Sequence, residues 1–142
     1  MAFVVDNSVA IAWCFADERT ASAMALLDRV MTERVMAPPI WPLEATNVLF
    51  VAERRRRITR AQRIEFLGFL HDLPIKIEVG RDIWGELSTW GPEPQLCERY
   101  GLTAYDASYL ALALTHRIPL ATRDKALIAA AKDQNLPLLE TL

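Results

Sequence analysis

The stretch LTAYDASYLALALTHRIPLATRDKAL, residues 102–127, decides the fold of this chain. Thr103 and Asp106 fit the capping-box pattern Ser/Thr-x-x-Asp/Glu that marks the start of a helix. The run SYLALALTH that follows is strongly helix-forming, so the stretch predicts a helix with an acid in its first turn. Ile118 and Pro119 end this helix, because proline cannot continue it.

The second half of the stretch predicts a strand followed by another helix. Residues 119–121 are apolar enough to pass through a buried sheet, and residues 122–124 begin the next helix. A strand that feeds a helix through a polar turn is half of a βαβ unit. Ligands in open α/β sheets bind at the carboxyl ends of strands, which is where Asp124 lies. If Asp106 faces the same end, two carboxylates meet there.

The composition predicts one ordinary globular domain that spans residues 1–142. Apolar residues make up 52% of the chain and charged residues 24%. The chain lacks an uncharged apolar span of about 18 residues, which argues against a membrane-spanning helix. The N-terminal MAFVVDNSVA has no Lys or Arg before Asp6 and is unlike a signal peptide. We therefore expect a cytoplasmic protein with no membrane partner, in which Cys14 and Cys97 are free thiols without metal-ligand spacing.

The rest of the chain alternates short apolar segments with helix-forming ones. Strands are expected at residues 3–5, 35–37, 75–79 and 137–139, in addition to 119–121. Further helices are expected at residues 9–16, 18–34, 41–57, 59–71, 83–90 and 93–100, the last ended by Gly101. This alternation predicts an α/β class fold, a three-layer α/β/α sandwich with a short and mainly parallel central sheet.

Four acids stand at the starts of predicted helices or just after predicted strands: Asp6, Glu44, Asp106 and Asp124. Each has a local explanation, because an acid near a helix N-terminus caps it or complements its dipole. Together they suggest more, since a parallel sheet brings its carboxyl ends to one edge. Clustered carboxylates raise one another's pKa unless a cation neutralises them. An oxygen-only cluster favours Mg²⁺ or Mn²⁺ over zinc, and such an ion supports phosphodiester hydrolysis.

The net charge of −2 argues only weakly against a nucleic-acid partner, because a local basic excess is hidden in it. From Glu53 to Arg63, six arginines stand against one glutamate, a local charge of 6 − 1 = +5. Arg54–Arg57 are either a solvated helix end, stabilised by the helix dipole by about 0.3–1 kcal/mol per charge, or a surface for phosphate or an acidic partner. Both interpretations stay open at this point.

Four segments resemble PIN-domain ribonucleases, and most of all the VapC-type toxins of bacterial type II toxin–antitoxin pairs. They are VVDNS at residues 4–8, PLEATNVL at 42–49, LTAYDASYLALA at 102–113 and LATRD at 120–124. The resemblance covers nearly the whole chain and implies a PIN fold with metal-dependent endoribonuclease activity. It implies that Asp6 and Asp106 are metal ligands, and that Asp124 and Glu44 complete the shell directly or through water. Ser8 and Thr122 fall where the family often has hydroxyls that support the acids.

The resemblance also implies partners. VapC-type toxins cut RNA, are usually homodimers, and are inhibited by a cognate antitoxin that lies over helices near the active site. Residues 45–52 and 64–70 offer apolar helical surfaces that suit such a groove in this chain. The alternative is a catalytically silent PIN-like module that binds protein or RNA, in which the acids only cap helices. A phosphotransfer protein is disfavoured, because Asp6-Asn7-Ser8 provides neither a second acid nor the Asp-x-Asp pattern.

Overall fold

The computed structural model describes residues 1–78 and 91–142 of the chain. In these residues the sheet has four strands, β1 (Ala2–Val5), β2 (Arg34–Ala37), β3 (Ile75–Ile77) and β4 (Leu120–Ala121). The order is β3-β2-β1-β4 and all the pairings are parallel, with Phe3 opposite Val35 and Val4 opposite Leu120. The prediction of a short parallel sheet is confirmed.

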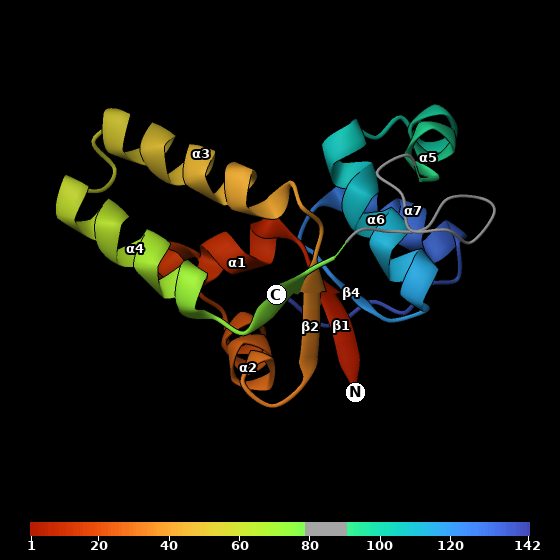
Figure 1. The fold of residues 1–142 in the computed structure, drawn as a ribbon, viewed down its shortest axis with the longest axis horizontal. Helices are drawn as coiled ribbons and strands as arrows, with labels where there is room; N and C mark the ends of the chain where they lie inside the picture. The colour runs from red at the N-terminus through yellow and green to blue at the C-terminus, as the bar shows by residue number, and fades with distance from the viewer. Residues whose placement is uncertain (79–90) are drawn as a thin grey trace.

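Helices cover both faces of this sheet, as Figure 1 shows. In the described chain the helices are α1 (Asn7–Cys14), α2 (Ala21–Val30), α3 (Trp41–Arg54), α4 (Arg60–Asp72), α5 (Glu93–Tyr100), α6 (Ala104–His116) and α7 (Lys125–Asp133). One side carries α1 and α2, with α3 and α4 packed together beyond α1; the other carries α6 and α7, with α5 beside α6. The fold is the expected three-layer α/β/α sandwich.

The central strand explains why the layers hold together. Phe3, Val4 and Val5 are all inaccessible to solvent, because β1 has a strand on each side and a helix layer on each face. A strand covered in this way needs apolar residues at every position instead of alternate ones. This is the pattern that the sequence shows, and it fixes the turn after β1 in place. Asp6 occupies the first position of that turn.

Two predicted helices are shorter in the structure. The helix expected at residues 18–34 is α2, because the Thr20 hydroxyl accepts a hydrogen bond from Ala23 N (3.1 Å) and so caps the helix there. Residues 16–18 form a separate 3-10 helix, and Arg34 belongs to β2. The helix expected at residues 41–57 ends at Arg54, since Arg56 adopts a left-handed conformation with φ 59°.

The remaining expectations concern the sheet edges and α5. Strand β3 is shorter than the expected 75–79, and Val79 and the helix expected at residues 83–90 lie outside the described residues. Instead of a strand at 137–139, Leu138 forms an isolated parallel bridge to Leu120. Helix α5 ends as predicted at Gly101, whose φ of 66° suits glycine. None of the described helices combines the length and apolar character needed to cross a membrane.

The buried indole of Trp13 joins α1 to α2, and its removal offers a test of the packing on this face. Its Nε1 donates to Ala23 O over 2.8 Å. Trp13→Phe keeps a ring but leaves this buried carbonyl without its donor, so we expect the free energy of unfolding to fall by about 1–3 kcal/mol. Trp41→Phe is the matched control, because Trp41 Nε1 is buried without a partner in the described residues. Urea denaturation in which both variants lose the same amount would contradict the role of this bond.

Candidate active site

Asp6 is the most buried of the four predicted acids, and two hydroxyl groups hold it. Its side chain caps α1, and only 5% of the residue is exposed. Ser8 Oγ donates to Asp6 Oδ2 over 2.7 Å, and Thr122 Oγ1 donates to the same oxygen over 2.8 Å. Burial raises the pKa of this carboxyl above its ordinary value, and the hydrogen bonds from Ser8 and Thr122 oppose that shift. Both supporting hydroxyls are the ones that the sequence suggested.

The same hydroxyls join the turn after β1 to the turn after β4. Arg123 N donates to Ser8 Oγ over 2.9 Å, and Asp124 N donates to Thr122 Oγ1 over 3.0 Å. Asp124 in turn caps α7, where its Oδ1 accepts from Leu127 N over 2.9 Å. Ser8 Oγ accepts from the turn after β4, and Thr122 Oγ1 donates across to Asp6 in the turn after β1. These two bonds hold the turns together, so they do not move independently. Asp124 therefore stands at the sheet edge next to Asp6.

Asp106 lies in the first turn of α6 with its carboxylate not used by the helix. Thr103 Oγ1 accepts from Asp106 N over 3.1 Å, which is one half of the predicted capping box. Among the described contacts the reciprocal bond from Thr103 N to the Asp106 carboxylate does not form, in contrast to α4, where Thr59 and Gln62 complete both halves. Burial first, and then the charges of Asp124 and Asp6, raise the pKa of Asp106.

Glu44 lies in the first turn of α3 and contacts a residue that the sequence analysis did not select. Tyr109 OH donates to Glu44 Oε1 over 2.5 Å. Tyr109 follows Asp106 by three positions and so lies on the same face of α6, which is the signal that could have identified it. Burial raises the pKa of Glu44; the Tyr109 bond opposes this shift, and the charges of Asp6 and Asp106 add to it. The pKa of Tyr109 is also raised, first by its own burial.

The four acids thus come from both helix layers and meet over the carboxyl ends of the strands. In Figure 1 the first turns of α3 and α6 lie on either side of the upper end of β1. Helix capping accounts for one role of Asp6 and Asp124, but it does not account for the Asp106 and Glu44 carboxylates. The charge interactions connect Glu44 to Asp6 and Asp106, and Asp106 to Asp124. The edge is therefore a single acidic site.

The donor set of this site is suited to a hard divalent cation. It offers only carboxylate and hydroxyl oxygens, the ligands that Mg²⁺ and Mn²⁺ prefer. Burial first, and then the charges of the neighbouring acids, raise the pKa values of Glu44 and Asp106, and a cation would oppose both effects. In the part of the chain that the structure describes, no three side chains of His, Cys, Asp or Glu are arranged around one point as they stand. Binding of an ion here would require the acidic side chains to turn toward it.

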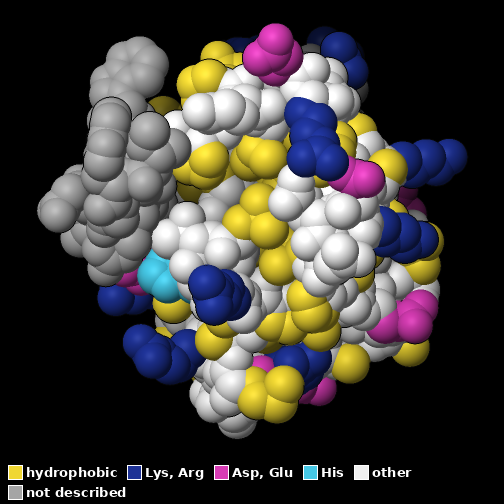
Figure 2. All heavy atoms as spheres, turned by 90° about the vertical axis from the view of Figure 1, so that its right-hand side faces the viewer, with side chains coloured by type: hydrophobic (Ala, Val, Ile, Leu, Met, Phe, Trp, Pro, Cys, Tyr) yellow, Lys and Arg dark blue, Asp and Glu magenta, His cyan; other side chains and the backbone are white. Residues whose placement is uncertain are grey.

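The other candidate groups lie apart from the acids. His71 is exposed at the end of α4, and His116 is half-buried at the end of α6. Arg54, Arg55 and Arg56 are exposed at the far end of α3 from Glu44. Arg57 differs from these three, because it forms ion pairs with Asp17 and Glu18 and stacks on Phe15. Its role is therefore structural. Over α5–α7, basic side chains are spread between acidic and apolar ones (Figure 2).

Comparison with known proteins identifies the family of this chain. Residues 3–133 match the PIN domain family, and the chain belongs to that family. The resemblance to PIN domains in the sequence is therefore confirmed. The matched range includes β2, β3, β4 and all of β1 except Ala2. No curated protein sequence matches the chain.

Several solved structures share the fold at low sequence identity. PAE2754 from Pyrobaculum aerophilum has a TM-score of 0.71 and 22% identity over 97% of this chain and 83% of its own. VapBC2 from Rickettsia felis, bound to a DNA fragment from its promoter, has a TM-score of 0.64 and 14% identity over 97% of both chains. FitAcB from Neisseria gonorrhoeae has a TM-score of 0.64 and 16% identity, over 98% and 97%. At these identities the likeness shows the fold.

The burial of the acids, together with the charges of their acidic neighbours at Glu44 and Asp106, predicts how stability depends on pH. In the folded, metal-free protein Asp6, Glu44 and Asp106 have pKa values above the ordinary 3.8 for Asp and 4.5 for Glu. Their contribution to stability is complete below those ordinary values and is lost as the pH rises through the raised ones. We expect Asp106→Asn to flatten this loss when unfolding by urea is followed in EDTA from acidic to neutral pH. A wild type and variant with parallel curves would show that the acids do not interact.

Proposed function

We propose that this protein is a metal-dependent endoribonuclease toxin that hydrolyses RNA phosphodiester bonds and is neutralised by a cognate antitoxin. The observation that carries the proposal is the acidic site itself, in which carboxylates from both helix layers lie at the carboxyl edge of the sheet. Burial and the charges of neighbouring acids raise the pKa values of Glu44 and Asp106 there. Membership of the PIN domain family supports a nuclease. The likeness in fold to VapBC2 and FitAcB, and the resemblance of the motifs to VapC-type toxins, support the toxin.

In this proposal Asp6, Glu44, Asp106 and Asp124 are the catalytic acids and the metal ligands. A bound Mg²⁺, or Mn²⁺ in its place, supplies an activated water and neutralises charge on the phosphate oxygens. The protein's own contribution is to hold the acids in place. The hydroxyls of Ser8 and Thr122 both bond Oδ2 of Asp6 and so fix the orientation of its carboxylate. The other oxygen, Oδ1, is bonded by neither hydroxyl. Tyr109 fixes one oxygen of Glu44 in the same way.

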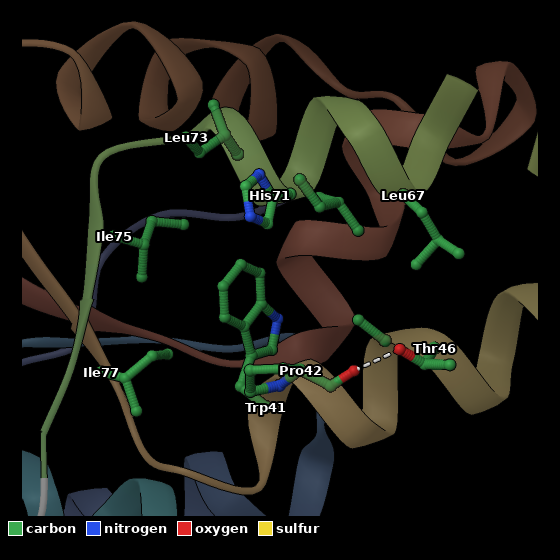
Figure 3. A pocket seen from close by; sticks show the side chains of 10 residues that line it. Trp41, Pro42, Thr46, Leu67, His71, Leu73, Ile75 and Ile77 are labelled. Carbon is green, nitrogen blue, oxygen red and sulfur yellow. Dashed lines mark hydrogen bonds between the residues drawn. The ribbon is translucent and has the colours of Figure 1, made fainter. Parts of the chain in front are cut away.

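An apolar cavity supports the proposed antitoxin partner. It has a volume of about 350 Å³ and lies between α3, α4 and β3. Figure 3 shows Trp41 from α3 and His71 and Leu67 from α4 around it, with Ile75 and Ile77 of β3 on the other side. These helices contain the two apolar surfaces, residues 45–52 and 64–70, that the sequence suggested for an antitoxin groove. As for VapC-type toxins in general, we also propose a cytoplasmic homodimer.

RNA cleavage is the direct test of the enzyme. Purified protein should cut a pool of total cellular RNA at discrete positions with Mg²⁺ or Mn²⁺, and EDTA should stop it. Asp106→Asn should reduce the rate by about two orders of magnitude or more, because it removes a charge that holds the metal. Its stability in EDTA should equal or exceed that of the wild type. End-mapping of the cut sites is the measurement, and cuts that persist in EDTA would contradict metal dependence.

The second candidate function is a catalytically silent module that binds protein or RNA. Two observations favour it: Asp6 and Asp124 act as helix caps, and the described acids are not arranged around one point. This candidate predicts that Asp6→Ala and Asp124→Ala lower the stability by about 0.5–2 kcal/mol through lost caps. It also predicts that neither these changes nor Asp106→Asn alters any activity. Absence of cleavage with every metal, in a folded protein freed of antitoxin, would favour it.

The toxin part of the proposal has its own test in living cells. Expression of the wild type alone should arrest growth, while expression of Asp6→Asn should not. Coexpression with the small protein encoded next to it should relieve the arrest. Leu67→Arg should abolish that relief, because it places a charge in the apolar cavity. Ala25→Arg, an exposed position on α2, is the matched control and should keep the relief. Harmless growth of the wild type would contradict the toxin.

A further inference from the structure

We propose that a cavity beside Asp6 binds one nucleobase of the RNA, next to the phosphodiester bond that is cut. This proposal rests on the proposed function and names the part of the site that reads the sequence of the substrate. The cavity has a volume of about 380 Å³, enough for one base. Its wall contains Asn7, Ser8 and Ile11 of α1, Val48 of α3 and Arg123 of the turn before α7.

The position of the cavity places a bound base within one nucleotide of the acids. Asn7 and Ser8 directly follow Asp6, and Ser8 Oγ donates to Asp6 Oδ2 over 2.7 Å while it also lines the cavity. Arg123, which also lines the cavity, donates its backbone N–H to that same Ser8 Oγ. The cavity and the acidic site therefore share a wall. A phosphate at the acids carries its flanking base toward this wall.

The polar wall carries a group that suits the edge of a base. Asn7 Oδ1 is buried and accepts no hydrogen bond from the described chain, although the residue lines the cavity. A buried amide oxygen without a donor is costly, and such a group in a functional cleft points to a partner outside the protein. Asparagine amides pair with base edges because they present a donor and an acceptor side by side. A small rotation of Asn7 would present this pair to a base.

The other walls suit the flat faces of a ring. Ile11 is buried on α1 and Val48 is half-buried on α3, and both contribute apolar surface to the cavity. Single-stranded RNA is commonly recognised by a base that leaves the stack, packs on side chains and is read at its edge. An apolar wall from each of two helices together with one amide fits that form of recognition.

The charges at the rim favour a neutral group over a phosphate. Asp17 and Glu18 line the open end of the cavity. Arg57 Nη2 bonds both carboxylates, over 3.1 Å and 2.8 Å, and Arg123 Nη1 donates to the Glu18 carbonyl over 2.8 Å. The two acids are thus balanced by two arginines. A rim without excess positive charge does not attract the RNA backbone, but it accepts the donors of a base.

Base preference in cleavage is the first test. Wild type, Asn7→Leu and Val48→Phe should be given the same RNA pool with Mg²⁺, and the bases on each side of every cut should be counted. We expect the wild type to prefer particular bases at one position beside the cut, and each variant to reduce that preference about 5-fold or more. Gln95→Ala, an exposed amide on α5, is the control and should keep it. An unchanged preference in both variants would overturn the proposal.

A binding measurement separates this proposal from the proposed function. AMP, CMP, GMP and UMP should be titrated into Asp106→Asn protein without metal, and NMR should follow the Asn7 side-chain amide and the methyl groups of Val48 and Ile11. We expect some nucleotides to shift these signals more than others, and Asn7→Leu to remove the difference. Such shifts would support the base site even if RNA were never cut. The proposal would be overturned if all four nucleotides caused equal NMR shifts or if none caused a shift. It would also be overturned if the only effect of Asn7→Leu were a loss of antitoxin binding.

Discussion

The burial of several carboxylates at the carboxyl edge of the sheet is the constraint on which the rest of this structure depends. A parallel sheet delivers the ends of its strands to one place, so acids in those turns meet whether or not they attract. Asp6 is buried there, and burial alone already disfavours its charge. The hydroxyls of Ser8 and Thr122 offset part of that cost by donating to one oxygen. The part of that cost that the hydroxyls do not offset is one that a bound cation would reduce.

The fold could be predicted from the sequence almost entirely, because its signals are local. The uninterrupted apolar run at Phe3–Val5 marks a strand covered on both faces, and Thr103 marks the start of α6. The errors lie where backbone geometry overrides periodicity. The left-handed conformation of Arg56 ends α3 early, and the Thr20 cap delays the start of α2. Neither a positive φ on an arginine nor the position of a capping hydroxyl is visible in a hydrophobic pattern.

The candidate site could be predicted as a set of acids, and its supporting groups only in part. Asp6 and Asp124 follow strands, so the topology places them, and Glu44 and Asp106 follow from helix starts. Tyr109 was missed because its hydroxyl lies in an otherwise apolar stretch of α6 that reads as core. Asn7, which we propose to bind a base, was not selected because an asparagine beside a capping acid is typical of a turn. Their roles depend on contacts between segments far apart in the chain, which no local pattern contains.

The bond between Tyr109 and Glu44 has a consequence for how this site tolerates change. Helix α6 belongs to one outer layer and α3 to the other, and this bond spans the gap between them over the sheet edge. The spacing of the acids is therefore set by the thickness of the whole sandwich. A substitution deep in either layer that swells or thins the packing shifts one half of the site against the other. The spacing of the acids therefore depends on core residues that do not contact a substrate.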